Sequence, residues 1–360
     1  ENVLWFANNK EDAYEEPTIK RSRSHNYVSK EVINVRENVG IIEVANFSKH
    51  EFKGPDARKF LDFIMAGRLP KPGRISLSPM LSYRGKLCGD LTIACLDENE
   101  FIVFGSGAAQ EMHRRWFESH LGKFNVNYNN RSDEFHGLSI AGPNSRKVLE
   151  KIVREDISNE KFKFRDSRRM FVGGVPAIVN RISFTGELGY EIYVAPHYQI
   201  KLYEELIQAG KEFTIKPFGG RALMSMRLEK NWGAWTLDYR PDFTAKETGL
   251  DTFINWNKDF IGKENAQKDN STKKIVPLIV ETNEIDLTNN EAVVNGTESI
   301  GYVTSGGFAH YVNKSVAFTF LDQNKINYDN KIQIEINGDL FNCSLIKDSL
   351  YDPTGQKMRS

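Results

Sequence analysis

Glu191 is the residue whose setting most strongly suggests chemistry. It lies in the run Tyr190-Glu-Ile-Tyr-Val194, directly after the turn Gly186-Glu-Leu-Gly189. Alternation along a strand places Tyr190 on one face and Glu191 on the other. A carboxylate buried among aromatic residues needs donors, and two parallel N–H groups of a flat ring would match its two oxygens. The alternative is a solvent-facing glutamate on an edge strand, which is common for this residue type.

Asp90 is the second candidate for chemistry. It follows the turn Gly85-Lys-Leu-Cys-Gly89 and precedes the apolar residues Leu91 and Ile93. Partial burial in such a stretch would raise the pKa of its carboxyl group and make it a useful proton acceptor near neutral pH. The open alternative is that Asp90 only caps the turn through hydrogen bonds to the backbone.

Arg227 is a third candidate, on a helix-like run that begins at Arg221. The spacing puts these two arginines on different faces, so they need not share a role. A fixed guanidinium could hold a carboxylate of a ligand or that of Glu191. On spacing alone, an ion pair with Glu229 or Asp238 is an equally good interpretation.

Three separated motifs resemble those of a known family. The segment Phe184-Thr-Gly-Glu-Leu-Gly-Tyr-Glu191 resembles the Tyr-Thr-Gly-Glu-x-Gly-aromatic-Glu signature of the glycine-cleavage T-protein (aminomethyltransferase) family. The segments 85–91 and 221–229 resemble its Gly-x-x-x-Asp-Asp-Leu element and its Ala-Arg-Asp-x-Leu-Arg-Leu-Glu helix. The similarity is greatest to the folate-binding C-terminal half of dimethylglycine and sarcosine dehydrogenases, from about Val32 to the end, including Leu350-Tyr-Asp-Pro353.

The resemblance implies a tetrahydrofolate site. Tetrahydrofolate captures one-carbon units with two amines, N5 and N10, so Asp90 would receive the N10 proton while Glu191 and Arg227 orient the cofactor. Aromatic rings stack well on a pterin, and the candidates for this contact are Tyr83, Phe184, Tyr190 and Trp235. The sequence departs from the family pattern at two positions, because Gly89 replaces the first aspartate of the pair and Phe184 replaces the usual tyrosine.

The expected function is transfer of a one-carbon unit from the iminium of an N-methylated glycine, giving 5,10-methylenetetrahydrofolate. Making that iminium requires a flavin. The segment Gly105-Ser-Gly107 lacks the glycines of a dinucleotide loop, so we expect no flavin in this chain and a flavin-dependent dehydrogenase domain or subunit as a partner. Two alternatives stay open: a folate-dependent demethylase of a sulfonium or quaternary ammonium compound that yields 5-methyltetrahydrofolate, and a folate-binding module without turnover.

Composition limits the class of protein. Lys plus Arg equals Asp plus Glu, at 48 each, so no global field favours nucleic acid or an acidic membrane as a partner. The three cysteines, Cys88, Cys95 and Cys343, lack the spacing of a zinc site or a disulfide framework, which favours a reducing compartment and no metal. No apolar run reaches the roughly 18 residues of a membrane span, and the start does not resemble a signal peptide, so we expect a cytoplasmic protein.

The fold predicted from the pattern is α+β, followed by a small antiparallel barrel. The segments 52–61 and 140–149 share a strand end, Gly-Pro, Asp or Asn, Arg-Lys and an amphipathic helix, which indicates two similar halves. After residue 275, short apolar runs alternate with Asn/Gly/Asp turns. We therefore expect an N-terminal extension (1–31), a folate-binding core (32–264, with halves at about 32–135 and 136–264) and a C-terminal barrel (275–360).

Overall fold

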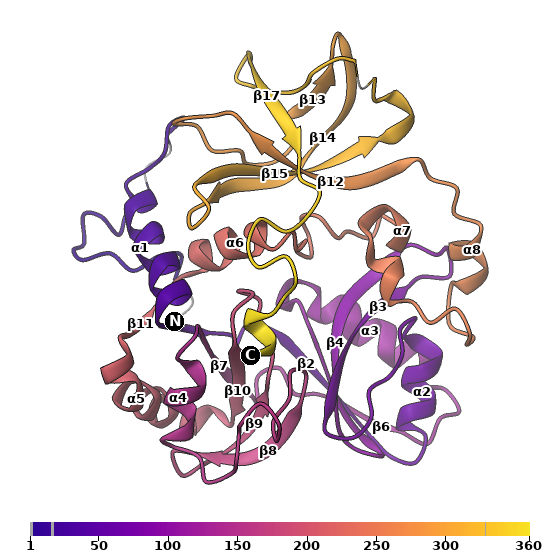
Figure 1. Cartoon of the computed structure of the whole chain (residues 1–360). Coiled ribbons are helices and arrows are strands. Elements are labelled where there is room, and N and C mark those ends of the chain that lie inside the picture. The colour runs from indigo at the N-terminus through magenta and orange to yellow at the C-terminus, as the bar shows by residue number, and fades with distance from the viewer. Residues whose placement is uncertain (1–2, 16–17, 328) are drawn as a thin grey trace.

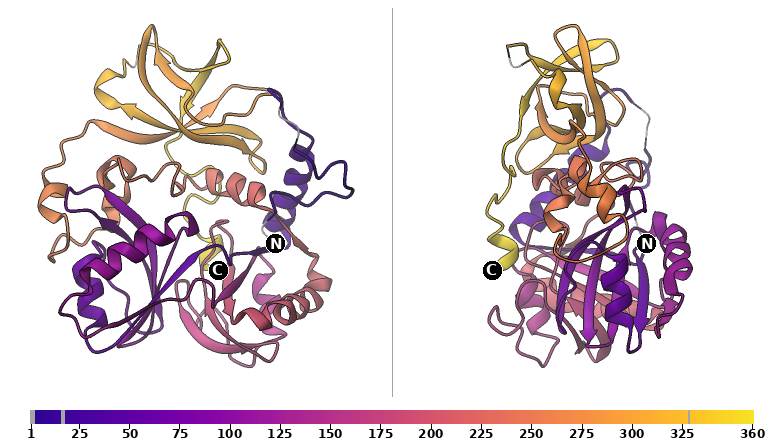
Figure 2. Two further views of the ribbon diagram at one scale, coloured as in Figure 1. Left: turned by 180° about the vertical axis from the view of Figure 1, so that it is seen from behind. Right: turned by 90° about the vertical axis from the view of Figure 1, so that its right-hand side faces the viewer.

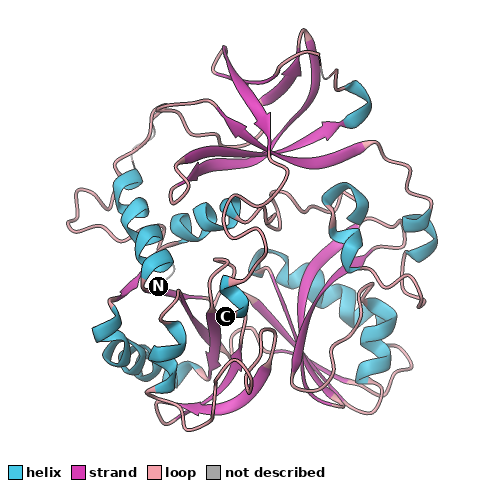
Figure 3. Ribbon diagram, viewed as in Figure 1, coloured by secondary structure: helices cyan, strands magenta, loops and turns pink. Residues whose placement is uncertain are grey.

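The computed structural model describes residues 3–15, 18–327 and 329–360. Two sheets with their helices lie side by side in the lower part of Figure 1, and a barrel lies above them. Helices α1 (Ser24–Glu37) and α6 (Gly220–Glu229) lie between the barrel and the sheets, and the C-terminal segment runs down from the barrel toward the sheets. The side view in Figure 2 and the colouring in Figure 3 show the same arrangement of one barrel above two sheet-and-helix units.

The first sheet contains five antiparallel strands in the order β3-β4-β5-β2-β6. One face is covered by α2 (Ala57–Ile64) and α3 (Gln110–Leu121), whose residues Phe60 and Phe117 pack with Leu91 and Ile93 of the sheet. The strands are β2 (Ser48–Lys53), β3 (Arg74–Leu81), β4 (Leu87–Asp97), β5 (Glu100–Gly105) and β6 (Asn127–Asn130).

The second sheet contains six strands in the order β11-β1-β7-β10-β9-β8, and only the β1–β11 pair is parallel. Its outer face is covered by α4 (Ser145–Glu150) and α5 (Gln199–Gly210), whose residues Leu149 and Leu202 join the core with Ile140. The strands are β1 (Val39–Glu43), β7 (His136–Ala141), β8 (Ser167–Val172), β9 (Val175–Asn180), β10 (Gly189–Val194) and β11 (Ile215–Pro217).

The two expected halves do not coincide with the two sheets. Strand β1 lies at residues 39–43, in the first half of the sequence, yet it pairs with β7 and β11 of the second sheet. Its Val39 and Ile41 are buried in the core of that sheet, so the same apolar burial that makes β1 a strand also places it there. The chain crosses to the first sheet only at β2.

The repeated strand-to-helix join has a steric reason for its glycine. Gly54 and Gly142 both have positive φ, +136° and +133°. A Cβ at Gly54 would lie 2.7 Å from the carbonyl oxygen of Asn125, and one at Gly142 would lie 2.5 Å from that of Asn38. Backbone atoms cannot move aside as a flexible side chain can, so only glycine fits at both positions.

The inner faces of the two sheets meet in a shared core. The rings of Phe104 from β5 and Tyr193 from β10 pack with their centroids 4.7 Å apart. Val32 of α1 and Met226 of α6 are buried in the same cluster, so the two helices close one side of it. Residues on these inner faces are therefore brought close together from segments that are remote in sequence.

The barrel is closed and antiparallel, in the order β12-β15-β14-β13-β16-β17. It has its own core, which includes Leu278, Val303 and Ile334. Its strands are β12 (Lys273–Val280), β13 (Ala292–Asn295), β14 (Glu298–Ala309), β15 (Lys314–Asp322), β16 (Ile332–Ile336) and β17 (Asp339–Leu345), and the short helices α7 (Ala245–Thr248) and α8 (Lys263–Gln267) precede it.

No helix in the described part of the chain is long and apolar enough to cross a bilayer. Cys88, Cys95 and Cys343 are free thiols. Among the described residues, no three His, Cys, Asp or Glu side chains are grouped so that they could hold a metal ion.

Candidate functional site

Glu191 lies on β10, between β7 and β9, so it is not on an edge strand. The alternation along β10 separates its neighbours as the sequence indicates. Tyr190 enters the outer core, where its ring stacks on Phe162 at 6.0 Å between centroids, whereas Tyr193 lies in the inner core. The hydroxyl of Tyr193 donates a hydrogen bond of 2.8 Å to Oε2 of Glu191, which places this carboxyl group on the inner face.

The carboxyl group of Glu191 is buried but incompletely bonded. The side chain is 7% exposed, and burial raises its pKa to about 7, against the opposing effects of the Tyr193 hydrogen bond and the positive charge of Lys49. Within the described residues its second oxygen, Oε1, accepts no hydrogen bond. A buried carboxylate with one vacant oxygen can accept further N–H donors.

Asp90 lies on β4, where alternation gives it the same face as Ala94, a residue of the inner core shared by the two sheets. Burial raises the pKa of its carboxyl group to about 7, and its own backbone N–H is the donor that opposes this shift. In the described part of the chain, its side chain forms no ion pair and no hydrogen bond to another side chain. The preceding turn is instead closed by Ser82, which accepts bonds from the N–H groups of Gly85 and Lys86.

Asp90 and Glu191 therefore extend from two different sheets toward the same interior. Each has a pKa near neutrality because burial disfavours its charged form. An acid with a pKa near 7 can gain or lose a proton at physiological pH, which is the property of a general acid or base. Together, the two groups offer a proton acceptor on one side and a vacant hydrogen-bond acceptor on the other.

The two terminal nitrogens of Arg227 are held by protein groups, whereas its Nε has no hydrogen-bond partner among the described residues. The side chain is 1% exposed; Nη1 donates to Oδ2 of Asp238 at 2.8 Å and to the carbonyl oxygen of Trp232 at 3.1 Å. Nη2 donates to the hydroxyl of Ser305 on β14 at 2.8 Å. The ion pair with Asp238, one of the two interpretations of the sequence, is present. Arg227 thus fixes the segment that follows α6 against the barrel.

The four aromatic candidates lie in different environments. Phe184 stacks on Trp232, with ring centroids 5.8 Å apart and planes inclined by 29°, at the turn that precedes β10. Trp235 lies 6.2 Å from the ring of His113, whose Nε2 is 3.0 Å from the carbonyl oxygen of Cys88, and so it lies near the start of β4. Both rings are partly exposed, as the walls of a binding pocket would be.

Tyr83 and Tyr190 lie outside the inner core that contains Tyr193, and their contact with the cofactor stays a prediction. Tyr83 is 62% exposed, and its hydroxyl is 2.8 Å from Nε2 of His120 on the outer helix α3. The turn between β3 and β4 extends beyond the inner core and therefore carries Tyr83 to the surface. Tyr190 is fully buried on the outer face of β10, because neighbouring residues of a strand point to opposite faces.

Three residues near the acids were not identified from the sequence. Tyr193 donates to Glu191, and alternation already placed the two on one face. Lys49 is fully buried near Glu191, but nothing in its sequence context distinguishes it from a surface lysine. Burial, with a contribution from the negative charge of Asp90, raises the pKa of Tyr239, which places this ring near Asp90.

A buried ionic network lies behind the Phe184 turn. The guanidinium of Arg36 donates to Glu187 at 3.0 Å and to Glu229 at 2.6 Å, and it lies 3.8 Å from the ring centroid of Tyr351. The hydroxyl of Tyr351 donates to Glu187, and its backbone N–H donates to the carbonyl oxygen of Glu229 at 3.0 Å. This network joins α1, α6, the turn before β10 and the C-terminal segment.

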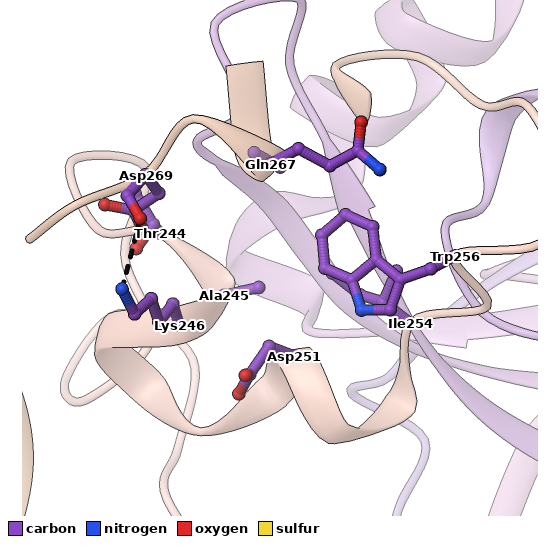
Figure 4. Close-up of a pocket in the computed structure, with 9 residues that line it drawn as sticks. Thr244, Ala245, Lys246, Asp251, Ile254, Trp256, Gln267 and Asp269 are labelled. Atoms are coloured by element: carbon purple, nitrogen blue, oxygen red, sulfur yellow. Dashed lines mark hydrogen bonds between the residues drawn. The ribbon is translucent and has the colours of Figure 1, made fainter. Parts of the chain in front are cut away.

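A surface pocket lies elsewhere, between α7 and α8, with a volume of about 280 Å³. Figure 4 shows its rim, where Lys246 donates a hydrogen bond to the backbone of Asp269, and the indole of Trp256 lies near Gln267. The lining contains none of the seven candidates from the sequence; it comprises Thr244, Ala245, Lys246, Asp251, Ile254, Trp256, Ala266, Gln267 and Asp269.

Comparison with protein families agrees with this architecture. Residues 1–258 match the model of the GCVT N-terminal domain, and residues 273–352 match that of the glycine cleavage T-protein C-terminal barrel domain. The chain belongs to the glycine cleavage T-protein family. The resemblance predicted from the three motifs is thus confirmed.

Two kinds of relative are similar to this T-protein family member. It is 33% identical over 358 residues to mitochondrial dimethylglycine dehydrogenase of Mus musculus, which covers 97% of the chain and 41% of the mouse protein. It therefore spans less than half the length of that relative. It is 29% identical over 330 residues to an aminomethyltransferase of Thermoanaerobacter pseudethanolicus, covering 90% of the chain and 89% of that protein.

A solved structure shares the fold. Aminomethyltransferase T of the glycine cleavage system from Bartonella henselae superposes with a TM-score of 0.82 and 22% sequence identity, over 91% of this chain and 90% of that one. Together with the closed six-stranded barrel, this likeness confirms the predicted T-protein-like α+β fold with a C-terminal antiparallel barrel.

Proposed function

We propose that this T-protein family member catalyses tetrahydrofolate-dependent one-carbon transfer. The donor in this proposal is the iminium of an N-methylated glycine, and the product is 5,10-methylenetetrahydrofolate. The main support is the pair of acids Asp90 and Glu191 on the facing inner surfaces of the two sheets, Glu191 buried and Asp90 partly buried, with no cation at ion-pair distance among the described residues. Membership of the family and the similarity to a dimethylglycine dehydrogenase and an aminomethyltransferase support the same reaction class.

The residues present fit a reduced pterin. Tetrahydrofolate, when bound, supplies two amines that capture a one-carbon unit, and a flat ring whose N–H groups act as paired donors. Glu191 has the vacant carboxylate oxygen that such donors require, and Phe184 offers a partly exposed ring for stacking. Arg227 would act indirectly, because its hydrogen bonds fix the segment that carries Trp232 and Trp235.

Asp90 is the residue that we assign to proton transfer. Its pKa of about 7 allows it to accept a proton from an amine at neutral pH and to release it afterwards. The apolar surroundings of the inner core exclude water, and a water-poor site would protect an iminium from hydrolysis to formaldehyde. The oxidation that generates the iminium would come from a flavin-dependent dehydrogenase domain or subunit as partner.

Substitution of Asp90 tests the assignment. Asp90→Asn keeps the shape of the side chain and removes its basicity, so we expect the rate of 5,10-methylenetetrahydrofolate formation to fall about 10²–10⁴-fold, with tetrahydrofolate affinity retained. Asp259→Asn is the control, because Asp259 is fully exposed at the surface. The assay supplies formaldehyde-derived iminium of glycine under anaerobic conditions, with product separation by chromatography.

The products also discriminate the remaining alternatives. Formation of 5-methyltetrahydrofolate from a sulfonium or quaternary ammonium compound, without a flavin, would replace the proposal by a demethylase. Folate binding without any product in the wild-type protein would indicate a binding module. An Asp90→Asn protein that turns over at the wild-type rate would remove Asp90 from the mechanism.

A further inference from the structure

Lys49 has an unusual environment for a lysine. It lies on β2 with no exposed surface, and among the described residues no carboxylate lies within ion-pair distance of it. Its ammonium group donates to two backbone carbonyl oxygens, that of Ala45 at 2.5 Å and that of Ser132 at 3.4 Å. Burying a cation without a direct counter-ion is costly.

The negative charges of three carboxylates affect the pKa of Lys49, and these carboxylates differ in how deeply they are buried. Burial lowers the pKa of Lys49 to about 8, and the negative charges of Asp133, Glu43 and Glu191 oppose this shift. Asp133 is exposed, and Glu43 is partly exposed and accepts a hydrogen bond from Gln199 at 3.0 Å, with His136 acting on it as well. Glu191 is the acid of the three that is buried.

Tyr193 is a neighbour of both Lys49 and Glu191. The ammonium nitrogen of Lys49 is 5.9 Å from the centroid of the Tyr193 ring, and the hydroxyl of the same ring donates to Glu191 at 2.8 Å. The lysine thus lies on one side of the ring and the carboxylate at its polar end. The positive charge of Lys49 favours the anionic form of Glu191, in addition to the hydrogen bond from Tyr193.

We propose that Lys49 is a positioning residue that favours the anionic form of Glu191, with Tyr193 as the connecting group, so that the vacant carboxylate oxygen accepts the N–H donors of the ligand. This inference rests on the proposed function, because the ligand is the reduced pterin. A neutral carboxylic acid would present a proton of its own to those donors, so loss of the lysine charge would weaken recognition of the ring.

The inference predicts a specific pH dependence. Donors on the ligand favour the charged form of Glu191, so binding near pH 7 releases a fraction of a proton, and affinity falls as the pH falls below about 7. Lys49→Met removes the positive charge at similar volume and raises the pKa of Glu191. A rise of one pKa unit would lower the ionised fraction at pH 7 about fivefold, with little change at pH 9.

The experiment is an anaerobic calorimetric titration of the full chain with tetrahydrofolate, from pH 6 to pH 9, in buffers of different ionisation enthalpy. We expect Lys49→Met to bind about fivefold more weakly than wild type at pH 7, to release more protons on binding, and to recover at pH 9. Lys49→Arg keeps the charge and should partly restore the wild-type profile. Lys53→Met is the matched control, since Lys53 lies on the same strand but pairs with Glu51 and Glu100.

A second measurement needs no folate. Carbon-13 NMR of labelled glutamate, assigned with Glu191→Gln, follows the titration of the Glu191 carboxyl group in the free protein, and its midpoint should be higher in Lys49→Met than in wild type. An unchanged midpoint would overturn the inference, as would an equal loss of folate affinity at every pH, which is the signature of a packing defect. Failure of wild type to bind tetrahydrofolate, with the midpoint shifted as expected, would instead overturn the proposed function.

Discussion

Four carboxylates of the protein interior, of which Asp90 is only partly buried, fall into two groups that differ in their partners. Behind the Phe184 turn, Glu187 and Glu229 both contact the guanidinium of Arg36, and all three side chains are at most 2% exposed. Between the sheets, Asp90 and Glu191 have no cation within ion-pair distance in the described residues. Glu187 and Glu229 therefore have a cationic partner, whereas Asp90 and Glu191 have none at ion-pair distance.

The difference separates structural from ligand-binding roles. Paired acids stabilise the arrangement of four segments, because each charge is compensated where it is buried. Unpaired acids destabilise the folded protein in their charged form and have pKa values near neutrality. The fold retains that cost at the position where a ligand could supply the missing donors.

The largest expected effect is on the paired group. Arg36→Met would leave Glu187 and Glu229 buried without their cation, which costs about 3–5 kcal/mol of unfolding free energy. Urea denaturation followed by circular dichroism measures this loss. Arg114→Met is the control, because Arg114 pairs with Glu111 and Glu118 on the surface of α3 and should lose at most about 1 kcal/mol. Equal losses in the two variants would contradict the distinction between the groups.

A smaller effect is expected where the C-terminal segment joins the network. Tyr351→Phe removes only the hydroxyl that donates to Glu187, and a hydrogen bond to a buried charge contributes about 1.5–3 kcal/mol. The same denaturation experiment measures it, with Tyr14→Phe, an exposed residue, as the control. Since Arg36 contacts both Glu187 and the ring of Tyr351, the losses of stability in Arg36→Met and Tyr351→Phe should not add. Additive losses would show that the contacts are independent.

The two unpaired acids, Asp90 and Glu191, should make the stability of the folded protein depend on pH. The folded pKa values of Asp90 and Glu191, about 7, exceed the ordinary values of 3.8 and 4.5, so the folded state holds these protons more tightly. The stabilisation that these two protonated carboxyl groups give the folded state is fully present below pH 4 and is lost as the pH rises to about 7. The double variant Asp90→Asn/Glu191→Gln should therefore lose less stability than wild type between pH 5 and pH 8, by at least about 1.4 kcal/mol. Parallel stability curves for variant and wild type would refute unpaired burial of the acids.

The smallest expected effect concerns the Phe184 turn. Gly186 has φ +82°, and a Cβ there would lie 2.5 Å from the side chain of Lys230, whose ammonium group is held by the carbonyl oxygen of Tyr351 at 3.0 Å. Gly174 has a similar φ of +79° but no atom within 4 Å of a Cβ. Gly186→Ala should thus cost about 1 kcal/mol more than Gly174→Ala, through crowding rather than backbone strain. Indistinguishable thermal midpoints would show that Lys230 moves freely.

Much of the fold could be predicted because its signals are local. The glycines at 54 and 142, the period-two alternation in β10 and the short apolar runs after residue 275 each reflect backbone geometry within a few residues. The assignment of β1 to the second sheet could not be predicted, since either sheet would bury its apolar residues and only the pairing with β7 and β11 decides between them.

Part of the candidate site could also be predicted, because part of it depends only on local strand geometry. Strand alternation places Glu191 with Tyr193 and opposite Tyr190, and that prediction needs no tertiary contact. The roles of Arg227 and Tyr83 depend on what lies beside them: Asp238 and Ser305 occupy the guanidinium of Arg227, and a surface turn carries Tyr83 to His120. The predicted contacts of the seven candidates with folate stay predictions.

The sequence alone determined the residue types available for chemistry, the family, and which face of each strand they share. Only the tertiary structure decided which acids meet an arginine and which do not. The ionisation of a buried carboxyl group depends on the charges and donors around it, and Arg36, Lys49, Glu191 and Tyr351 reach their neighbours from distant parts of the chain.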